Sequence, residues 1–215
     1  STLISSGVKI KSINQENDGI SLNLTYDQFT NNNYTLNKIM GSYSVVLSDV
    51  PAEKPSSLAG NMNVVSYAVK DNAANIGFFW NELQGSSVKL TGIESTDNGV
   101  ITIDSQKYFS ATRETFISSF LGTSNFIVKD ASLVDAANLA TYSNVSKFTV
   151  KDSTYNISNG LEKLLTYKNS NFLTSITNIN PKNPISVDYG DLTKYQPIFS
   201  QIENKDYVLK VNKVD

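Results

Sequence analysis

The sequence predicts an α/β fold in which repeated strand–helix units stack as an α/β solenoid. The first observation is that a strand–helix–strand construction occurs three times, at residues 19–49, 99–130 and 184–211. Each copy follows an apolar, strand-like run, and these runs start 80 and 85 residues apart, at Val8, Val88 and Leu173. Fixed-period similarity of this kind indicates a repeat architecture.

The second observation is that strand-like and helix-like patterns alternate along the whole chain, which favours parallel strands joined by right-handed crossovers. The third is a short step: the strands that begin at Phe126 and Phe148 start only 22 residues apart. This step holds one strand and one short helix, as in stacked α/β coils. The alternative is two compact β-α-β-β-α-β domains, divided near residues 51–63 or near residue 145.

The first part of the chain shows both periods. Residues 8–13 and 20–24 alternate between apolar and polar side chains, as half-buried strands do. A helix is expected to begin near Thr25 or Asp27, to run through Ile39 and Met40, and to end at Gly41. A buried strand follows at residues 43–47.

The middle of the chain opens with residues 51–63, which contain Pro51, Pro55 and Gly60 and are predicted to be a loop or an insertion. A strand at residues 64–69 leads to Asp71, a predicted N-cap. The helix after it carries Ile76, Phe79, Trp80 and Leu83 at helical spacing.

The pattern then repeats. Strands are expected at residues 88–93 and 100–103, and Ser105 is predicted to cap a helix whose apolar side chains are core residues, namely Phe109, Phe116, Ile117 and Phe120. The remaining strands are expected at 126–130, 148–152, 173–179, 185–187 and 207–211, with helices at 133–142, 157–165 and 192–202, the last containing Pro197. The predicted units are therefore 1–50, the 51–63 loop or insertion, 64–145 and 146–215, which could form one continuous domain.

Composition excludes several classes of function. The 215 residues carry a net charge of −2, which gives no electrostatic reason to expect nucleic acid. The absence of Cys and His removes the commonest nucleophile–base pairs and metal ligands, and a single arginine, Arg113, disfavours bidentate anion clamps. No apolar run approaches the length of a membrane-spanning helix. The chain starts without Met, and we expect it to be a piece of a larger protein.

Several segments resemble repeats of very large secreted bacterial surface proteins of the adhesin-like and S-layer-like kind, often exported by type I secretion. Residues 67–76, Tyr-Ala-Val-Lys-Asp-Asn-Ala-Ala-Asn-Ile, are similar to a strand-Asp-Thr-Ala-Ala-Asn-Ile element of those repeats. Residues 28–39 resemble their second helix, and residues 173–176 their intervening strand. Residues 152–157 depart from the pattern by losing both alanines. The resemblance implies an extracellular structural or adhesive role and supplies no catalytic residue.

Candidate sites are few. Val-Lys-Asp occurs at residues 69–71, 128–130 and 150–152, where each Asp is predicted to cap a helix. The oxygen side chains of Asp97, Asn98 and Asp104, and of Asp188 and Asp191, lack the alternating spacing of a calcium loop, so a turn or cap role is favoured over a metal site. Exposed tyrosines at equivalent repeat positions could stack on sugars, and the candidate ligand-binding residues are Tyr26, Tyr108 and Tyr189.

These observations predict a non-catalytic structural or cell-surface module of a secreted bacterial protein, acting as an S-layer-like lattice element, spacer or anchor. No cofactor and no metal are expected. The expected partners are further copies or neighbouring modules of the same protein, with a cell-envelope polysaccharide as the alternative partner of a glycan-binding adhesin domain. A remote alternative is a carboxylate-dependent glycoside hydrolase, with acids chosen from Asp104, Glu114, Asp188 and Glu203.

Overall fold

The computed structural model describes residues 11–14, 19–109, 113–121, 124–205 and 207–213. These residues form parallel β-sheets whose strands are joined by short helices, so the α/β prediction with parallel strands is confirmed. The chain divides into two compact units, one of Ser1–Gly99 with Glu114–Gly122 and one of Val100–Arg113 with Thr123–Asp215. We call a strand together with the helical segment that follows it a coil.

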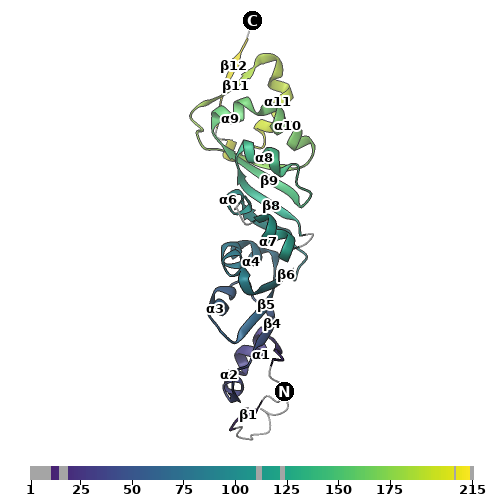
Figure 1. Ribbon diagram of the computed structural model, residues 1–215. Coiled ribbons are helices and arrows are strands. Elements are labelled where there is room, and N and C mark those ends of the chain that lie inside the picture. The colour runs from purple at the N-terminus through teal and green to yellow at the C-terminus, as the bar shows by residue number, and fades with distance from the viewer. Residues whose placement is uncertain (1–10, 15–18, 110–112, 122–123, 206, 214–215) are drawn as a thin grey trace. The chain divides into compact units, whose positions relative to one another are not determined.

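The sheet of the first unit has four parallel strands, and each pairs with the next strand of that sheet along the chain (Figure 1). The strands lie side by side in the order β2 (Leu22–Thr25), β4 (Val45–Val50), β5 (Val64–Asp71) and β6 (Leu90–Ser95). A separate parallel pair is formed by β1 (Ile13–Asn14) and β3 (Ile39–Met40).

The helices of the first unit are short. They are α1 (Tyr26–Asn31), α2 (Asn33–Leu36), α3 (Pro55–Ala59), α4 (Ala73–Phe78), α5 (Trp80–Gly85), the 3₁₀ turn η2 (Ser87–Lys89), and α7 (Arg113–Phe120) from Glu114 onward. Thr25 caps α1 with a reciprocal capping box to Gln28, so of the two predicted starting points, Thr25 and Asp27, the cap is Thr25.

Two expectations for this unit change. Ile39 and Met40 do not extend the helix: α2 ends at Leu36, and the two residues form β3 because they pair with β1. Residues 51–63, expected to be a loop or an insertion, contain α3, which starts with Pro55 at a position where a missing N–H costs nothing. Of the strand predicted at residues 8–13, residues 8–10 lie outside the described residues, and of the other three only Ile13 belongs to a strand, β1.

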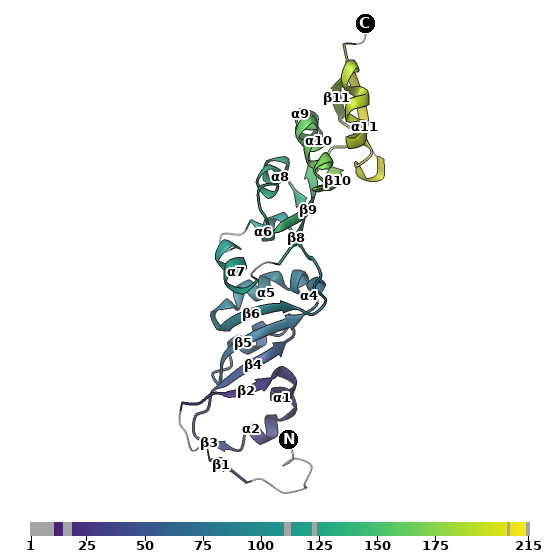
Figure 2. The same ribbon diagram turned by 90° about the vertical axis from the view of Figure 1, so that its right-hand side faces the viewer.

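The second unit repeats this strand arrangement (Figure 2). Its four parallel strands are β7 (Ile101–Asp104), β8 (Phe126–Ala131), β9 (Val145–Asp152) and β10 (Leu173–Asn178), adjacent in that order. A further parallel pair, β11 (Pro184–Asp188) and β12 (Val208–Asn212), follows in the chain. The helical segments are α6 (Ser105–Tyr108), α8 (Leu133–Leu139), α9 (Thr154–Asn159), α10 (Leu161–Asn169), η3 (Tyr189–Asp191), α11 (Leu192–Phe199) and η4 (Glu203–Lys205).

In each unit the core lies between the inner face of the sheet and the helices. In the first unit Leu47, Tyr67 and Trp80 are at most 1% exposed, and Trp80 packs edge-to-face on Phe116. In the second unit Phe126 and Phe148 are fully buried. The predicted core role of Trp80 and Phe116 is confirmed, whereas Phe109 and Phe120 are half-buried.

Candidate functional site

The most distinctive polar site of the first unit is the carboxylate of Asp71, at the end of β5. Its Oδ1 accepts the backbone N–H of Asn72 at 2.8 Å and the side-chain amide of Asn75 at 2.8 Å. Its Oδ2 accepts the backbone N–H of Ala52, in the preceding coil, at 2.9 Å. One carboxylate therefore fixes the start of its own helix and ties that helix to the coil before it.

The second unit contains the same site at Asp152, 81 residues later (152 − 71). Asp152 Oδ1 accepts the backbone N–H of Ser153 at 2.7 Å and the side-chain amide of Asn156 at 2.7 Å. Its Oδ2 accepts the backbone N–H of Leu133 at 2.8 Å, again in the preceding coil. Asp152 is only 7% exposed, so this carboxylate is satisfied by N–H donors rather than by water.

These contacts correct the predicted capping roles. The N-caps of α4, α8 and α9 are Asn72, Ser132 and Ser153, each of which accepts an N–H of its own helix. The aspartates of the Val-Lys-Asp triplets lie before these caps. The prediction was wrong because it considered only local helix rules, whereas Asp71 and Asp152 use one oxygen for a residue 19 positions earlier.

Asp130, the third of these aspartates, has a different role. Its backbone is left-handed, with φ of 57°, and its carboxylate pairs with Lys151 Nζ at 3.1 Å. The side chain of Ser105, predicted to be an N-cap, donates to the Asp130 carbonyl instead, and the N-cap position of α6 is Asp104. Asp49, at the corresponding end of β4, is also left-handed, with φ of 53°.

Asp97 links two further segments of the first unit. Its Oδ1 accepts the backbone N–H of Ala73 at 3.1 Å, the hydroxyl of Ser95 at 2.6 Å and the backbone N–H of Gly99 at 3.0 Å. The hydroxyl of Ser95, followed by these two N–H groups, lowers the pKa of Asp97 below its ordinary value. This oxygen therefore acts in a turn, as predicted. Among the described residues, no cluster of three or more acidic side chains could hold a metal ion.

The three candidate tyrosines differ in exposure. Tyr26 is half-buried at the first position of α1, and Tyr189 is 61% exposed at the start of η3. Tyr108 is 1% exposed, and its hydroxyl donates to Asn144 Oδ1 at 2.9 Å, so its ring cannot stack on a ligand. The prediction that Tyr108 is exposed like the other two tyrosines was therefore wrong. Tyr26 and Tyr189 directly follow the cap positions Thr25 and Asp188, but Tyr108 lies at the end of its helix.

Two of the acids proposed for glycoside hydrolysis form contacts with neighbouring side chains. Glu203 accepts the hydroxyls of Ser175 and Thr177, and Asp188 forms an ion pair with Lys213. Asp104 is exposed at the N-cap of α6. The side chain of Glu114 lies outside what the structure describes.

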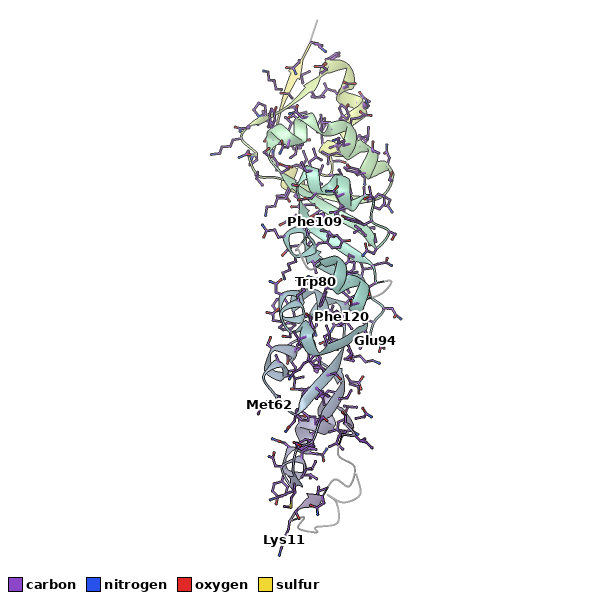
Figure 3. The ribbon with its side chains drawn as sticks, viewed as in Figure 1. Lys11, Met62, Trp80, Glu94, Phe109 and Phe120 are labelled. Carbon is purple, nitrogen blue, oxygen red and sulfur yellow. The ribbon has the colours of Figure 1, made fainter. Side chains whose placement is uncertain are left out.

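A groove of about 390 Å³ lies on the first unit, beside β5 and β6. Asp49, Lys70, Glu94 and Phe120 contribute to its lining, and Figure 3 shows the last two of these side chains. Lys70 and Glu94 form an exposed ion pair at 2.9 Å, which raises the pKa of Lys70 through its hydrogen bond to Glu94. Lys70 and Glu94 thus neutralise each other, and Asp49 is the remaining charged residue of the lining.

A groove of about 460 Å³ lies on the second unit between α11 and β12. It is lined by Leu192, Thr193, Gln196, Phe199, Ser200, Lys205, Tyr207 and Leu209. Phe199 and Tyr207 stack with ring centroids 5.9 Å apart. Sequence reasoning missed this groove, and it also missed Asn75 and Asn156. For these two asparagines a signal was present, because Asp-(Asn/Ser)-x-x-Asn occurs at 71–75 and at 152–156.

Comparison of the chain with protein-family models, with curated proteins and with solved structures finds no significant match. None of the helices that the structure describes has the length and apolar character needed to cross a membrane.

Proposed function

We propose that this chain is a non-catalytic structural module of a secreted bacterial surface protein. Its coils stack as an α/β solenoid, and it serves as a spacer, anchor or lattice element. Its partners are neighbouring modules or further copies of the same protein. The extracellular location follows from the resemblance of residues 67–76 and 173–176 to repeats of such proteins.

One observation carries the proposal, namely the use of the Asp71 and Asp152 carboxylates to join successive coils. A catalytic carboxylate needs an oxygen that can reach a substrate. Here both oxygens of each carboxylate accept N–H groups. One oxygen accepts an N–H of the residue that follows the aspartate, and the other accepts an N–H of the preceding coil. Contacts between neighbouring units are what hold a stacked repeat together, because each unit alone cannot bury its apolar face.

The proposed location can be tested by labelling intact cells of the source organism with an antibody against this chain. Strong labelling of intact cells, not increased by permeabilisation, is expected. Labelling that appears only after permeabilisation would refute a surface role. The stacked arrangement has a separate test, the hydrogen exchange of Leu133 in an Asp152→Ala variant, which should accelerate in the coil before the substitution.

A glycan-binding adhesin domain is the second candidate, and the exposed ring of Tyr189 is the observation that favours it. Aromatic faces contribute to sugar binding through stacking. The test is a glycan array with the unmodified chain and with Tyr189→Ala, with Tyr34→Ala as the control because Tyr34 is also exposed, at 69%. Binding that survives Tyr189→Ala would remove this residue from the hypothesis.

A further inference from the structure

The face formed by β12 and α11 in the second unit combines a strand edge that is unpaired among the described residues with half-buried apolar side chains. We propose that it takes a further helix–strand segment of the type that follows β4 and β8, with the strand parallel to β12. This inference rests on the proposed stacking of coils. It adds the position of the contact, its register and the sequence type of the segment that binds there.

The backbone places β12 in the same structural position as β4 and β8. Each of the three pairs in parallel with a strand that ends at an extended N-cap residue, and the paired residues are Thr25 with Ser48, Asp104 with Lys129, and Asp188 with Asn212. The next residue along the chain is left-handed in all three cases, with φ of 53° at Asp49 in β4, 57° at Asp130 in β8 and 54° at Lys213, directly after β12. Non-glycine residues rarely adopt this conformation, so its recurrence identifies the strands as equivalent.

Burial then differs between equivalent positions. In β8, Phe126 and Val128 are fully buried, and β9 is the strand that pairs beside them. The matching residues of β12 are Leu209 and Val211, and both are only half-buried. Within the part of the chain that the structure describes, β12 pairs with β11 alone. A strand edge and apolar side chains that are buried in the other copies are therefore accessible here.

The groove between α11 and β12 extends this accessible face, because Leu209 and Phe199 both line it. In the other copies a helix follows the equivalent strand and buries a leucine, Leu58 in α3 and Leu139 in α8. The proposed segment places a helix of that kind, with its leucine, against the leucine and aromatic side chains of this groove. The same helix also leads directly into the strand that pairs at the edge.

The known registers specify the partner strand. Valine lies opposite the first core position, as in Val45 with Val64 and Phe126 with Val145. An aromatic residue lies opposite the second, as in Leu47 with Tyr67 and Val128 with Phe148. The carbonyl of the preceding asparagine, Asn63 or Asn144, accepts the N–H of the first core residue. The segment bound by β12 should therefore read Asn-Val-x-x-(Tyr/Phe)-x-Val.

The charge expected of this partner differs from that of β9, the strand that pairs with β8. In the second unit Lys151 of the following strand pairs with Asp130 at 3.1 Å. The residue equivalent to Asp130 is a cation, Lys213, which directly follows β12 and pairs with Asp188. A partner with an acidic residue in place of the lysine fits this face better, because a lysine there would meet a like charge.

The test adds such a segment to the whole protein. In the extended chain, residues 1–213 are followed by a second copy of residues 131–178. Residue 131 of the added copy then follows Lys213 as it follows the equivalent residue, Asp130, in the protein itself. The backbone amides of Leu209 and Val211 should then exchange at least about tenfold more slowly than in the unmodified protein. Changing Lys151→Glu in the added copy should raise the melting temperature further, and combining it with Lys213→Glu should cancel that gain.

A matched control carries Phe148→Asp in the added copy, which places a charge at the position opposite Val211 and should remove the protection. The inference is overturned if the added copy leaves the hydrogen exchange of Leu209 and Val211 unchanged. This holds even if the added copy is unfolded, because the same residues, 131–178, fold beside β8 in the protein itself and should fold in the same way beside an equivalent strand. Protection of the unmodified protein by a cell-envelope polysaccharide, without protection by the added copy, would assign the face to a glycan instead. None of these outcomes depends on the Asp152→Ala result, which tests the stacking alone.

Discussion

The hydroxyl of Tyr67 donates a 2.6 Å hydrogen bond to the carbonyl of Ser86 inside the first unit. This bond joins β5 to the residue that follows α5, and Tyr67 is fully buried. In the second unit the residue at the same position of the strand is Phe148, which has no hydroxyl. The ring is thus common to both units, while the hydrogen bond is specific to the first.

The first prediction is that Tyr67→Phe destabilises the protein by about 1–2 kcal/mol, because the ring still packs but the Ser86 carbonyl loses its buried donor. Urea denaturation of the two proteins measures the difference. Tyr34→Phe, at a side chain 69% exposed, is the control and should have no measurable effect. An equal loss in both variants would contradict the assignment.

The burial of Tyr67 has a consequence at alkaline pH. It raises the pKa of Tyr67 above its ordinary value, because desolvation disfavours the charged phenolate. Since the folded pKa exceeds the unfolded one, the contribution of Tyr67 is complete below pH of about 10 and is lost as the pH rises through the folded pKa. The stability of Tyr67→Phe should therefore decline less above pH 10 than that of the unmodified protein.

The second prediction concerns the two bridging aspartates. Asp71→Ala and Asp152→Ala should each destabilise the protein by about 1–3 kcal/mol, because each leaves backbone N–H groups in two successive coils without an acceptor. Thermal unfolding measures this loss. Glu82→Ala is the matched control, since Glu82 is an exposed acidic residue in the first turn of a helix. If the three variants lost equal stability, the bridging contacts of Asp71 and Asp152 would contribute no more to stability than an exposed helix-start carboxylate does.

Local rules predicted much of the fold. The parallel strands follow from the alternation of periods, and the start of α1 was placed near Thr25 or Asp27 because groups that cap a helix lie within a few residues of its start, as Thr25 and Gln28 do. The bridging role of Asp152 could not be predicted in this way, because its partner Leu133 lies 19 residues earlier and becomes a neighbour only when the coils are in place. The burial of Tyr108 was missed because similar short sequence segments were aligned without knowledge of their backbone register.

The third prediction uses two glycines. A Cβ on Gly160 would lie 2.0 Å from Leu133 Cδ2 and 3.0 Å from the backbone oxygen of Asn156. Gly160→Ala should therefore destabilise the protein by about 1–3 kcal/mol, as overpacking does in other cores. Gly85→Ala is the control, because no atom lies within 4 Å of the added Cβ. This change, at the end of α5, should be neutral or stabilising by up to about 1 kcal/mol. In chemical denaturation, the midpoint of Gly160→Ala should therefore fall below that of the unmodified protein, and the midpoint of Gly85→Ala should stay the same or rise.

The fourth prediction concerns acid stability of the second unit. Glu203 accepts the hydroxyl of Thr177 at 2.7 Å and that of Ser175 at 2.9 Å. These bonds, that of Thr177 first, lower the pKa of Glu203 below its ordinary value, because they favour the charged form. A carboxylate whose folded pKa is depressed contributes stability that is complete above its unfolded pKa, about 4.3, and is lost as the pH falls through the folded value.

Glu203→Gln should therefore be less stable than the unmodified protein at pH 7, and the difference should shrink when both are measured near pH 3. At low pH the protonated side chain of Glu203 is uncharged, like the amide of the Gln variant. Both proteins then lack the charged hydrogen bonds to Ser175 and Thr177. Urea denaturation at the two pH values tests this, with Glu82→Gln as a control whose effect should not depend on pH in the same way. A difference between Glu203→Gln and the unmodified protein that stays constant down to pH 3 would show that the charge on Glu203 does not strengthen its bonds to Ser175 and Thr177.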